Sequence, residues 1–170
     1  KTDDLALVTG AQYAYAMSKL LFMPADFTVG AEYSYNKLID TQLAYNREID
    51  QMVNIKSIFA QNEWKNKKLS LLIGLRYDHH NLIDDPIFSP RVNVRYNPAE
   101  WVNLRASYAS GFRAPQAFDE DLHITAVGGE VQLITLDPDL RPENSKSYSL
   151  STDFYKNFGK VQTNLLIEAF

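Results

Sequence analysis

The chain has 170 residues, of which 17 are lysine or arginine and 21 are aspartate or glutamate, and it contains no cysteine. The near balance of charge argues against a nucleic-acid-binding protein, which needs a dense basic face. Without cysteine the chain has no disulfide framework, no cysteine-ligated zinc and no thiol nucleophile. No apolar run approaches the roughly 20 residues that a transmembrane helix needs.

Apolar and polar residues alternate with a period of two along most of the chain, which predicts β-strands. In the stretch 69–77, for example, Leu69, Leu71 and Ile73 alternate with Ser70 and Gly74. We expect eight strands, in chain order at about 5–19, 27–38, 51–63, 67–79, 89–97, 101–110, 145–156 and 160–170. The alternation is weaker in the first and third of these strands.

The connections between the expected strands are alternately short and long. The short ones, at 66–67, 97–100 and 157–160, contain Asn, Pro and Gly, which suit tight turns. The long ones span about 39–50, 80–88 and 111–144. Tight turns on one side and long loops on the other are typical of a transmembrane β-barrel of the bacterial outer membrane.

Aromatic residues on the apolar rows gather near both ends of the expected strands. Those near the long loops are Tyr35, Tyr77, Tyr108 and Tyr148, and those near the short turns are Phe27, Tyr96, Trp101 and Phe154. Two aromatic girdles are expected where a barrel meets the two membrane interfaces. A general strand preference of aromatic residues is the alternative explanation. On the girdle interpretation, Leu71, Ile73, Leu104 and Ile167 face lipid.

Three motifs follow one another within residues 88–155. They are Ser89-Pro90-Arg91, then Gly111-Phe112-Arg113-Ala114-Pro115, then Asp137-Pro138-Asp139-Leu140-Arg141-Pro142-Glu143. In this order they resemble consecutive barrel segments of TonB-dependent outer-membrane receptors, with Asp137 and Arg141 in place of the usual Asn and Lys. The stretch from Gln116 to Asp121 is similar to receptors of the Bacteroides group. Residues 1–87 fit the family by architecture alone.

The resemblance implies that residues 1–170 form an incomplete part of a large transmembrane barrel, as an antiparallel all-β meander. A whole receptor of this kind has roughly 22 strands around a plug. We expect the plug domain and the segment that contacts TonB to lie outside this chain. The implied partners are the plug, the TonB complex, outer-membrane lipid and a small-molecule cargo. The implied function is uptake of a nutrient such as a ferric siderophore, haem or cobalamin.

The long connection 111–144 is the expected site of contact with cargo, because uncommonly long loops on a rigid scaffold tend to be functional. Its candidate contact residues are Phe112, Arg113, Gln116, Asp119, Glu120, Asp121 and His123. The apolar stretch 131–136 predicts a short hairpin within the loop. The alternative is a loop that only shields the barrel mouth. Asp119, Glu120, Asp121 and His123 form an acidic group, which either binds a hard cation or is a solvated part of the loop.

The residues of the motifs have structural explanations. Pro90 and Pro115 lack an N–H and suit strand ends, and Gly111 can adopt dihedral angles that let the chain leave the sheet. Pro138 favours a turn, and Arg113 can pair with Glu143 across the base of the loop. Ser89, Ala114, Leu140 and Pro142 complete the structural set.

Enzymatic and metal-binding motifs are missing from the sequence. It contains no glycine-rich phosphate loop and no nucleophile elbow, so we expect neither catalysis nor a cofactor. The adjacent His79 and His80 suggest a metal or haem contact, but neighbouring side chains in a strand point to opposite faces, which disfavours a shared ion.

Two other folds remain open from the sequence. One is a small closed eight-stranded structural or adhesive barrel, in which the first strand would pair with the last. The other is a soluble β-sandwich binding module, which would have no lipid-facing belt. For part of a larger barrel we expect an open sheet with two unpaired edges.

Overall fold

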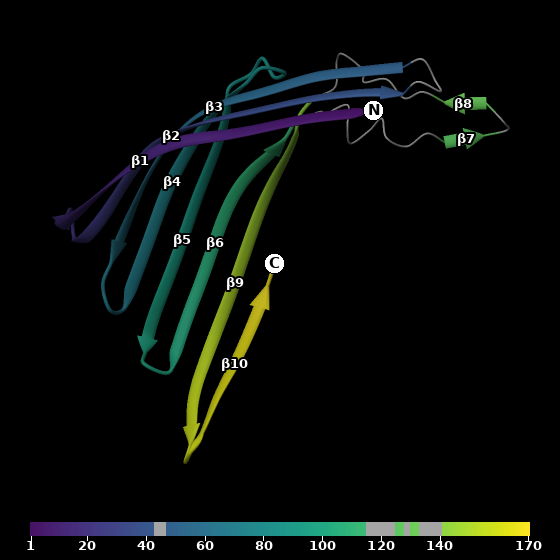
Figure 1. Ribbon diagram of the computed structural model, residues 1–170. Coiled ribbons are helices and arrows are strands. Elements are labelled where there is room, and N and C mark those ends of the chain that lie inside the picture. The colour runs from purple at the N-terminus through teal and green to yellow at the C-terminus, as the bar shows by residue number, and fades with distance from the viewer. Residues whose placement is uncertain (43–46, 115–124, 128–129, 133–140) are drawn as a thin grey trace.

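The computed structural model describes residues 1–42, 47–114, 125–127, 130–132 and 141–170, and Figure 1 shows a single curved sheet of long strands. The strands are β1 (Thr2–Leu20), β2 (Met23–Gln42), β3 (Arg47–Lys65), β4 (Leu69–His80), β5 (Ile87–Ala99), β6 (Val102–Arg113), β9 (Glu143–Phe158) and β10 (Val161–Ala169). A separate short hairpin consists of β7 (Thr125–Val127) and β8 (Glu130–Gln132). No described helix is long and apolar enough to cross a membrane.

Each strand of the sheet pairs antiparallel with its neighbours in the order β1-β2-β3-β4-β5-β6-β9-β10. The strands β1 and β10 are the two edges and do not pair with each other. This arrangement confirms the predicted open meander and argues against a small closed barrel. The described strands also do not form two packed sheets, which a β-sandwich requires.

The register divides the sheet into two faces of opposite character. We call the face that carries Glu32, Ser57, Arg76, Arg91 and Arg105 the inner face, because the register places them on alternate rows that all point to the same side of the sheet. The other rows carry Ile58, Ile73, Leu104, Leu150 and Ile167, and we call them the outer face.

Burial on the two faces is the reverse of that in a water-soluble protein. On the inner face Asp78 and Asp153 are each 2% exposed, whereas on the outer face Ile58 is 60% and Leu150 is 59% exposed. Apolar side chains that project outward and polar ones that are buried inward suit a sheet with lipid on one side and a polar lumen on the other. The predicted lipid-facing positions Ile73 and Ile167 lie on the exposed apolar face.

Aromatic pairs lie at both ends of the sheet. At the end with short turns, Phe22 stacks on Trp64 with ring centroids 5.7 Å apart, and Trp101 stacks on Phe154 at 6.4 Å. At the end with long loops, Tyr77 pairs with Phe88 at 5.4 Å, and Tyr108 with Tyr148 at 5.1 Å. We refer to these as the turn end and the loop end. Of the residues predicted to form the girdles, these pairs include Tyr77, Tyr108, Tyr148, Trp101 and Phe154.

The turn end is stabilised by local hydrogen bonds. The backbone N–H groups of Lys68 and Leu69 both donate to Asn66 Oδ1 at 2.8 Å, which closes the turn between β3 and β4. Gly159 adopts a φ of 61° in the turn between β9 and β10, a conformation that favours glycine. These short turns place the ends of neighbouring strands directly beside each other.

The predicted connection at 39–50 is wrong for most of its length. Pairing of β2 with β3 continues outward to Gln42 and Arg47, whereas pairing of β3 with β4 begins only at Ile55 and His80. A strand that extends beyond the bilayer has water on both faces and no longer needs alternation, so the period-two pattern that predicts a strand is missing there. The loop before β5 is likewise shorter than predicted.

The hairpin predicted at 131–136 also needs correction. The structure has a hairpin in this connection, but its strands are Thr125–Val127 and Glu130–Gln132. Residues 133–136 lie outside the described part of the chain.

Candidate functional site

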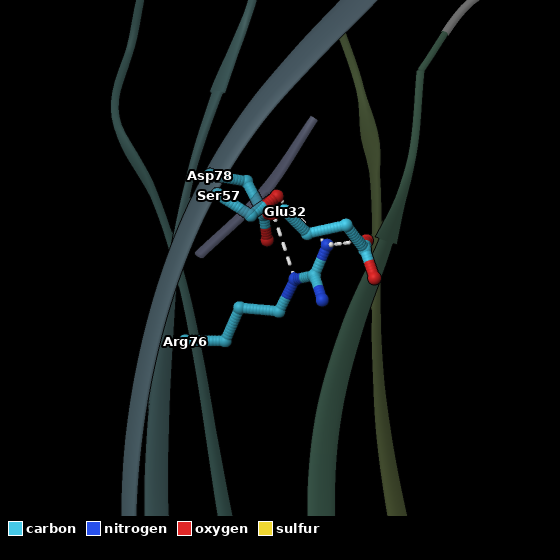
Figure 2. Close-up of polar contacts among 4 residues, drawn as sticks. All are labelled: Glu32, Ser57, Arg76 and Asp78. Atoms are coloured by element: carbon cyan, nitrogen blue, oxygen red, sulfur yellow. Dashed lines mark hydrogen bonds and ion pairs between the residues drawn. The ribbon is translucent and has the colours of Figure 1, made fainter. Parts of the chain in front are cut away.

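The inner face carries a four-residue polar network that joins three strands (Figure 2). Glu32 comes from β2, Ser57 from β3, and Arg76 and Asp78 from β4. Glu32 and Ser57 are register partners, and so are Ser57 and Asp78. Alternation with a period of two therefore places all four side chains on the same face at nearly the same height.

Arg76 is the centre of this network. Its Nε donates to Asp78 Oδ1 at 2.8 Å, and its Nη2 donates to Glu32 Oε1 and to Ser57 Oγ at 2.7 Å each. Ser57 Oγ in turn donates to Asp78 Oδ1 at 2.5 Å. Because Asp78 is almost fully buried, these donors compensate for the hydration that its carboxylate has lost.

A hollow of about 450 Å³ lies beside this network on the inner face. Its lining includes Glu32, Phe59, Arg76, Ser89 and Arg91. Arg91 donates a hydrogen bond to Gln61 Oε1, which leaves its positive charge without a carboxylate among the ion pairs of the described residues. The hollow therefore offers a polar, partly cationic wall toward the lumen.

The inner face remains polar toward β9. Arg105 forms an ion pair with the buried Asp153, and Ser107 and Ser149 share a hydrogen bond of 2.6 Å. Arg95 is the register partner of Arg105, so two arginines lie directly opposite each other. Like charges in such a pair repel unless an anion or water lies between them.

A small apolar cluster forms at the loop end beside the inner face. Ile83, Ile87 and Ala114 are buried together, and Phe112 packs against them. The His80 ring meets the Phe112 ring edge-on with centroids 6.3 Å apart, and the Leu82 N–H donates to His80 Nδ1 at 3.0 Å. The cluster fixes the connection between β4 and β5 against the end of β6.

The first family motif lies within β5. Ser89 and Arg91 point to the inner face, while Pro90 lies between them opposite Leu75 of β4. Pairing of β5 with β6 begins only at Arg91, so the missing N–H of Pro90 falls where β5 has no β6 partner. Pro90 therefore lies close to a strand end, as predicted, although β5 begins earlier, at Ile87.

The second motif closes the end of β6. Gly111 pairs with Ser145 in regular strand geometry, so the prediction that its dihedral angles let the chain leave the sheet is wrong. A Cβ atom there would lie 3.2 Å from Ser145 Oγ, which gives glycine a packing role instead. Phe112 and Ala114 belong to the apolar cluster, and Arg113 is the register partner of Glu143.

Most of the predicted cargo contacts are not placed by the structure. Gln116, Asp119, Glu120, Asp121 and His123 lie outside the described residues, as do Pro115, Pro138 and Leu140 of the motifs. Pro142 directly precedes β9. Of the candidate contacts, only Phe112 and Arg113 are described, and both lie at the loop end of β6.

His79 and His80 differ sharply in environment. His79 is exposed on the outer face, whereas His80 is 1% exposed and lies on the inner row. Their opposite directions agree with the geometric argument against one shared ion. Within the described ranges, no three His, Asp or Glu side chains are grouped so that they could hold a metal ion.

The sequence did not identify the Glu32–Ser57–Arg76–Asp78 network. Its members lie on three strands, and only the register brings them together. In the sequence, charged residues at these positions alternate with apolar ones. This alternation predicts a polar face, but it does not predict which charged side chains bond to one another.

The family model described as "TonB dependent receptor-like, beta-barrel" matches residues 3–166. The chain belongs to this family. Barrels of this family lie in the bacterial outer membrane, and this chain is accordingly a piece of an outer-membrane barrel wall. The match includes residues 3–87, where the sequence had shown only a fitting architecture.

Curated relatives are named for the binding of haemoglobin or as a receptor for ferric enterobactin. The chain is 29% identical over 144 residues to the probable hemoglobin and hemoglobin-haptoglobin-binding protein 3 of Haemophilus influenzae, which covers 84% of this chain and 11% of the relative. It is 32% identical over 74 residues to the ferric enterobactin receptor of Pseudomonas aeruginosa, covering 43% of this chain and 10% of that receptor. The chain thus spans about a tenth of the length of these relatives.

Solved structures share the fold. The ferric enterobactin receptor PfeA of Pseudomonas aeruginosa superimposes with a TM-score of 0.76 at 21% identity, covering 97% of this chain and 26% of that chain. The siderophore receptor PirA of the same organism gives a TM-score of 0.74 at 18% identity, with coverages of 97% and 31%.

Proposed function

We propose that this chain is part of the wall of an outer-membrane receptor that binds and imports an iron-carrying nutrient. The observation that carries the proposal is the family match over residues 3–166 on a sheet with one lipid-type face and one polar face. The curated relatives are named for haemoglobin or ferric enterobactin, which favours haem or a ferric siderophore over cobalamin as the cargo. We assign the chain no catalytic role and no cofactor.

In this proposal the inner face lines the lumen and contacts a plug domain that lies outside the chain. The exposed arginines of β5, Arg91 and Arg95, supply cationic donors to whatever fills that space. The TonB complex would act through a segment that is also outside the chain. Energy coupling would therefore occur at sites other than this wall.

We propose that cargo is contacted at the loop end by Arg113, Gln116, Asp119, Glu120, Asp121 and His123. Phe112 takes an anchoring role instead, because it packs on the cluster of Ile83, Ile87 and Ala114. Arg113 and Glu143 lie opposite each other at the base of the connection, where a rigid sheet holds the ends of the loop.

The test uses a strain that lacks the full-length receptor, grown with haem, haemoglobin, a ferric siderophore or cobalamin as the limiting nutrient. We expect loss of growth on one iron source and its restoration by the wild-type gene. A gene deleted for about residues 119–135, the extent of the loop interpretation, should restore receptor abundance without growth. Loss of growth on cobalamin alone would contradict an iron cargo. Full growth with the loop deletion would contradict cargo contact by the loop.

A further inference from the structure

The outer face has a shallow hollow of about 540 Å³ near its loop end, spread over β1 to β4. The register explains its shape. Ala31 lies in one row between Ala11 and Ile58, and the two small alanine side chains leave the floor low beside Ile58. One row nearer the loop end, Thr9, Tyr33, Lys56 and His79 follow one another across the four strands. The hollow thus has an apolar floor and a polar rim on its loop side.

The rim carries a positive charge without a counterion in the described structure. Lys56 is exposed on the outer face, and none of the ion pairs of the described residues includes it. Its register partners are Tyr33 on β2 and His79 on β4, and neither is acidic. The hydroxyl of Tyr33, the imidazole of His79 and the ammonium of Lys56 all supply hydrogen-bond donors at one height.

The location of the rim restricts what can bind there. It lies one row nearer the loop end than Tyr77, one of the aromatic residues that mark the outer interface of the membrane. Acyl chains lie on one side of that interface, and lipid headgroups lie on the other. A long cationic side chain at this height extends its ammonium toward the headgroups, while its stem stays on apolar surface.

We propose that the hollow binds a phosphorylated lipid of the outer leaflet. The phosphate accepts hydrogen bonds from Lys56 and from the donors of Tyr33 and His79, and one acyl chain lies across Ala31 and Ile58. The charge complementarity rests on Lys56, and the shape complementarity rests on the low floor at Ala31. This site lies on the opposite face of the sheet from the lumen, so it is independent of the nutrient that the receptor imports.

The test uses the purified full-length receptor in detergent. Bisphosphorylated lipid A, the same lipid after removal of both phosphates, and inorganic phosphate are each added, and bound lipid is counted by native mass spectrometry. We expect tight retention of the phosphorylated lipid only. Equal retention of the dephosphorylated lipid, or displacement of the lipid by inorganic phosphate at similar concentration, would overturn the proposal.

Variants locate the site. Lys56→Gln should weaken retention about five- to tenfold, because one basic residue near a charged lipid surface contributes on the order of 1 kcal/mol. Lys67→Gln removes the same charge from a turn at the opposite end and should leave retention unchanged. Ala31→Phe fills the floor while keeping the charge, and it should weaken retention as well. Wild-type retention of the lipid by both Lys56→Gln and Ala31→Phe would refute the site. Lys56→Arg keeps the positive charge and should retain the lipid, and loss of the lipid from this variant would also refute the site.

Discussion

The two faces of the sheet are built on different principles. On the inner face, side chains from neighbouring strands are joined by directed bonds, as in the Glu32–Ser57–Arg76–Asp78 network and the Arg105–Asp153 pair. On the outer face, Ile73 and Leu150 project outward as exposed apolar side chains, and aromatic pairs such as Tyr77–Phe88 and Tyr108–Tyr148 lie nearer the ends of the strands. The packing of the inner face therefore depends on specific hydrogen-bonding and ion-pair partners. The outer face requires only hydrophobic side chains, and many different residues supply these.

The largest difference between the two faces should appear when an arginine is introduced at one position on each face. Leu150→Arg places a guanidinium on the apolar face at mid-sheet, where it costs about 2–4 kcal/mol in a membrane. The adjacent Ser149→Arg places the same group on the polar face. We expect the outer-membrane level of the full-length receptor to fall sharply for Leu150→Arg and to stay near wild type for Ser149→Arg. The amount of folded receptor in the outer membrane is measured on a heat-modifiability gel. Equal amounts of the two variants would show that the faces are assigned wrongly.

Removing the centre of the network should have the next largest effect. Arg76→Gln leaves the buried carboxylate of Asp78 with Ser57 as its remaining donor. Loss of such a partner costs about 1–3 kcal/mol, reduced here because Arg76 is partly exposed. The free energy of unfolding of the receptor in detergent measures this loss.

The matched control for Arg76→Gln is the double variant Arg76→Gln/Asp78→Asn, which removes the orphaned charge. It should recover part of the lost stability, since the buried group is then neutral. A double variant less stable than Arg76→Gln alone would mean that Asp78 is stabilised mainly by other groups.

Two adjacent cross-strand pairs allow the finest comparison. Ser107 and Ser149 face each other on the inner face, and Tyr108 and Tyr148 do so on the outer face. A double-mutant cycle to Ala should give a coupling energy of about 0.2–1 kcal/mol for the serine pair, because it removes one hydrogen bond. A cycle to Phe should give a coupling energy near zero for the tyrosine pair, because it removes only the hydroxyl groups and keeps the contact between the rings. A zero serine coupling would contradict the hydrogen bond of 2.6 Å.

The faces were predictable from the sequence because they follow from alternation. Leu71 and Ile73 on one row and Gly74 and Arg76 on the other are enough to assign β4, and the same logic gave the order of all eight strands. The meander followed from short turns such as Asn66-Lys67, since strands joined by so few residues must be neighbours.

The remaining features depend on information that a single sequence lacks. The partnership of Arg76 with Glu32 spans 44 positions and requires the register of three strands. Gly111 has a packing role that became visible only when Ser145 was placed opposite it. The sequence predicts a loop for the outer part of β2, because Leu38 and Ile39 are adjacent apolar residues and alternation is no longer required in this segment.

That outer part of the sheet makes the barrel wall unequal in height. Beyond the row of Ile55 and His80, β2 and β3 continue together to Gln42 and Arg47, a ribbon of about 25 Å at roughly 3.3 Å per residue. The wall over β4 to β6 ends well below this level. Seen from outside the cell, this sector of the rim is a step with a tall side of hydrogen-bonded backbone. A bulky object that approaches from the side of β1 to β3 therefore meets folded, hydrogen-bonded ribbon before it reaches the level at which β4 ends.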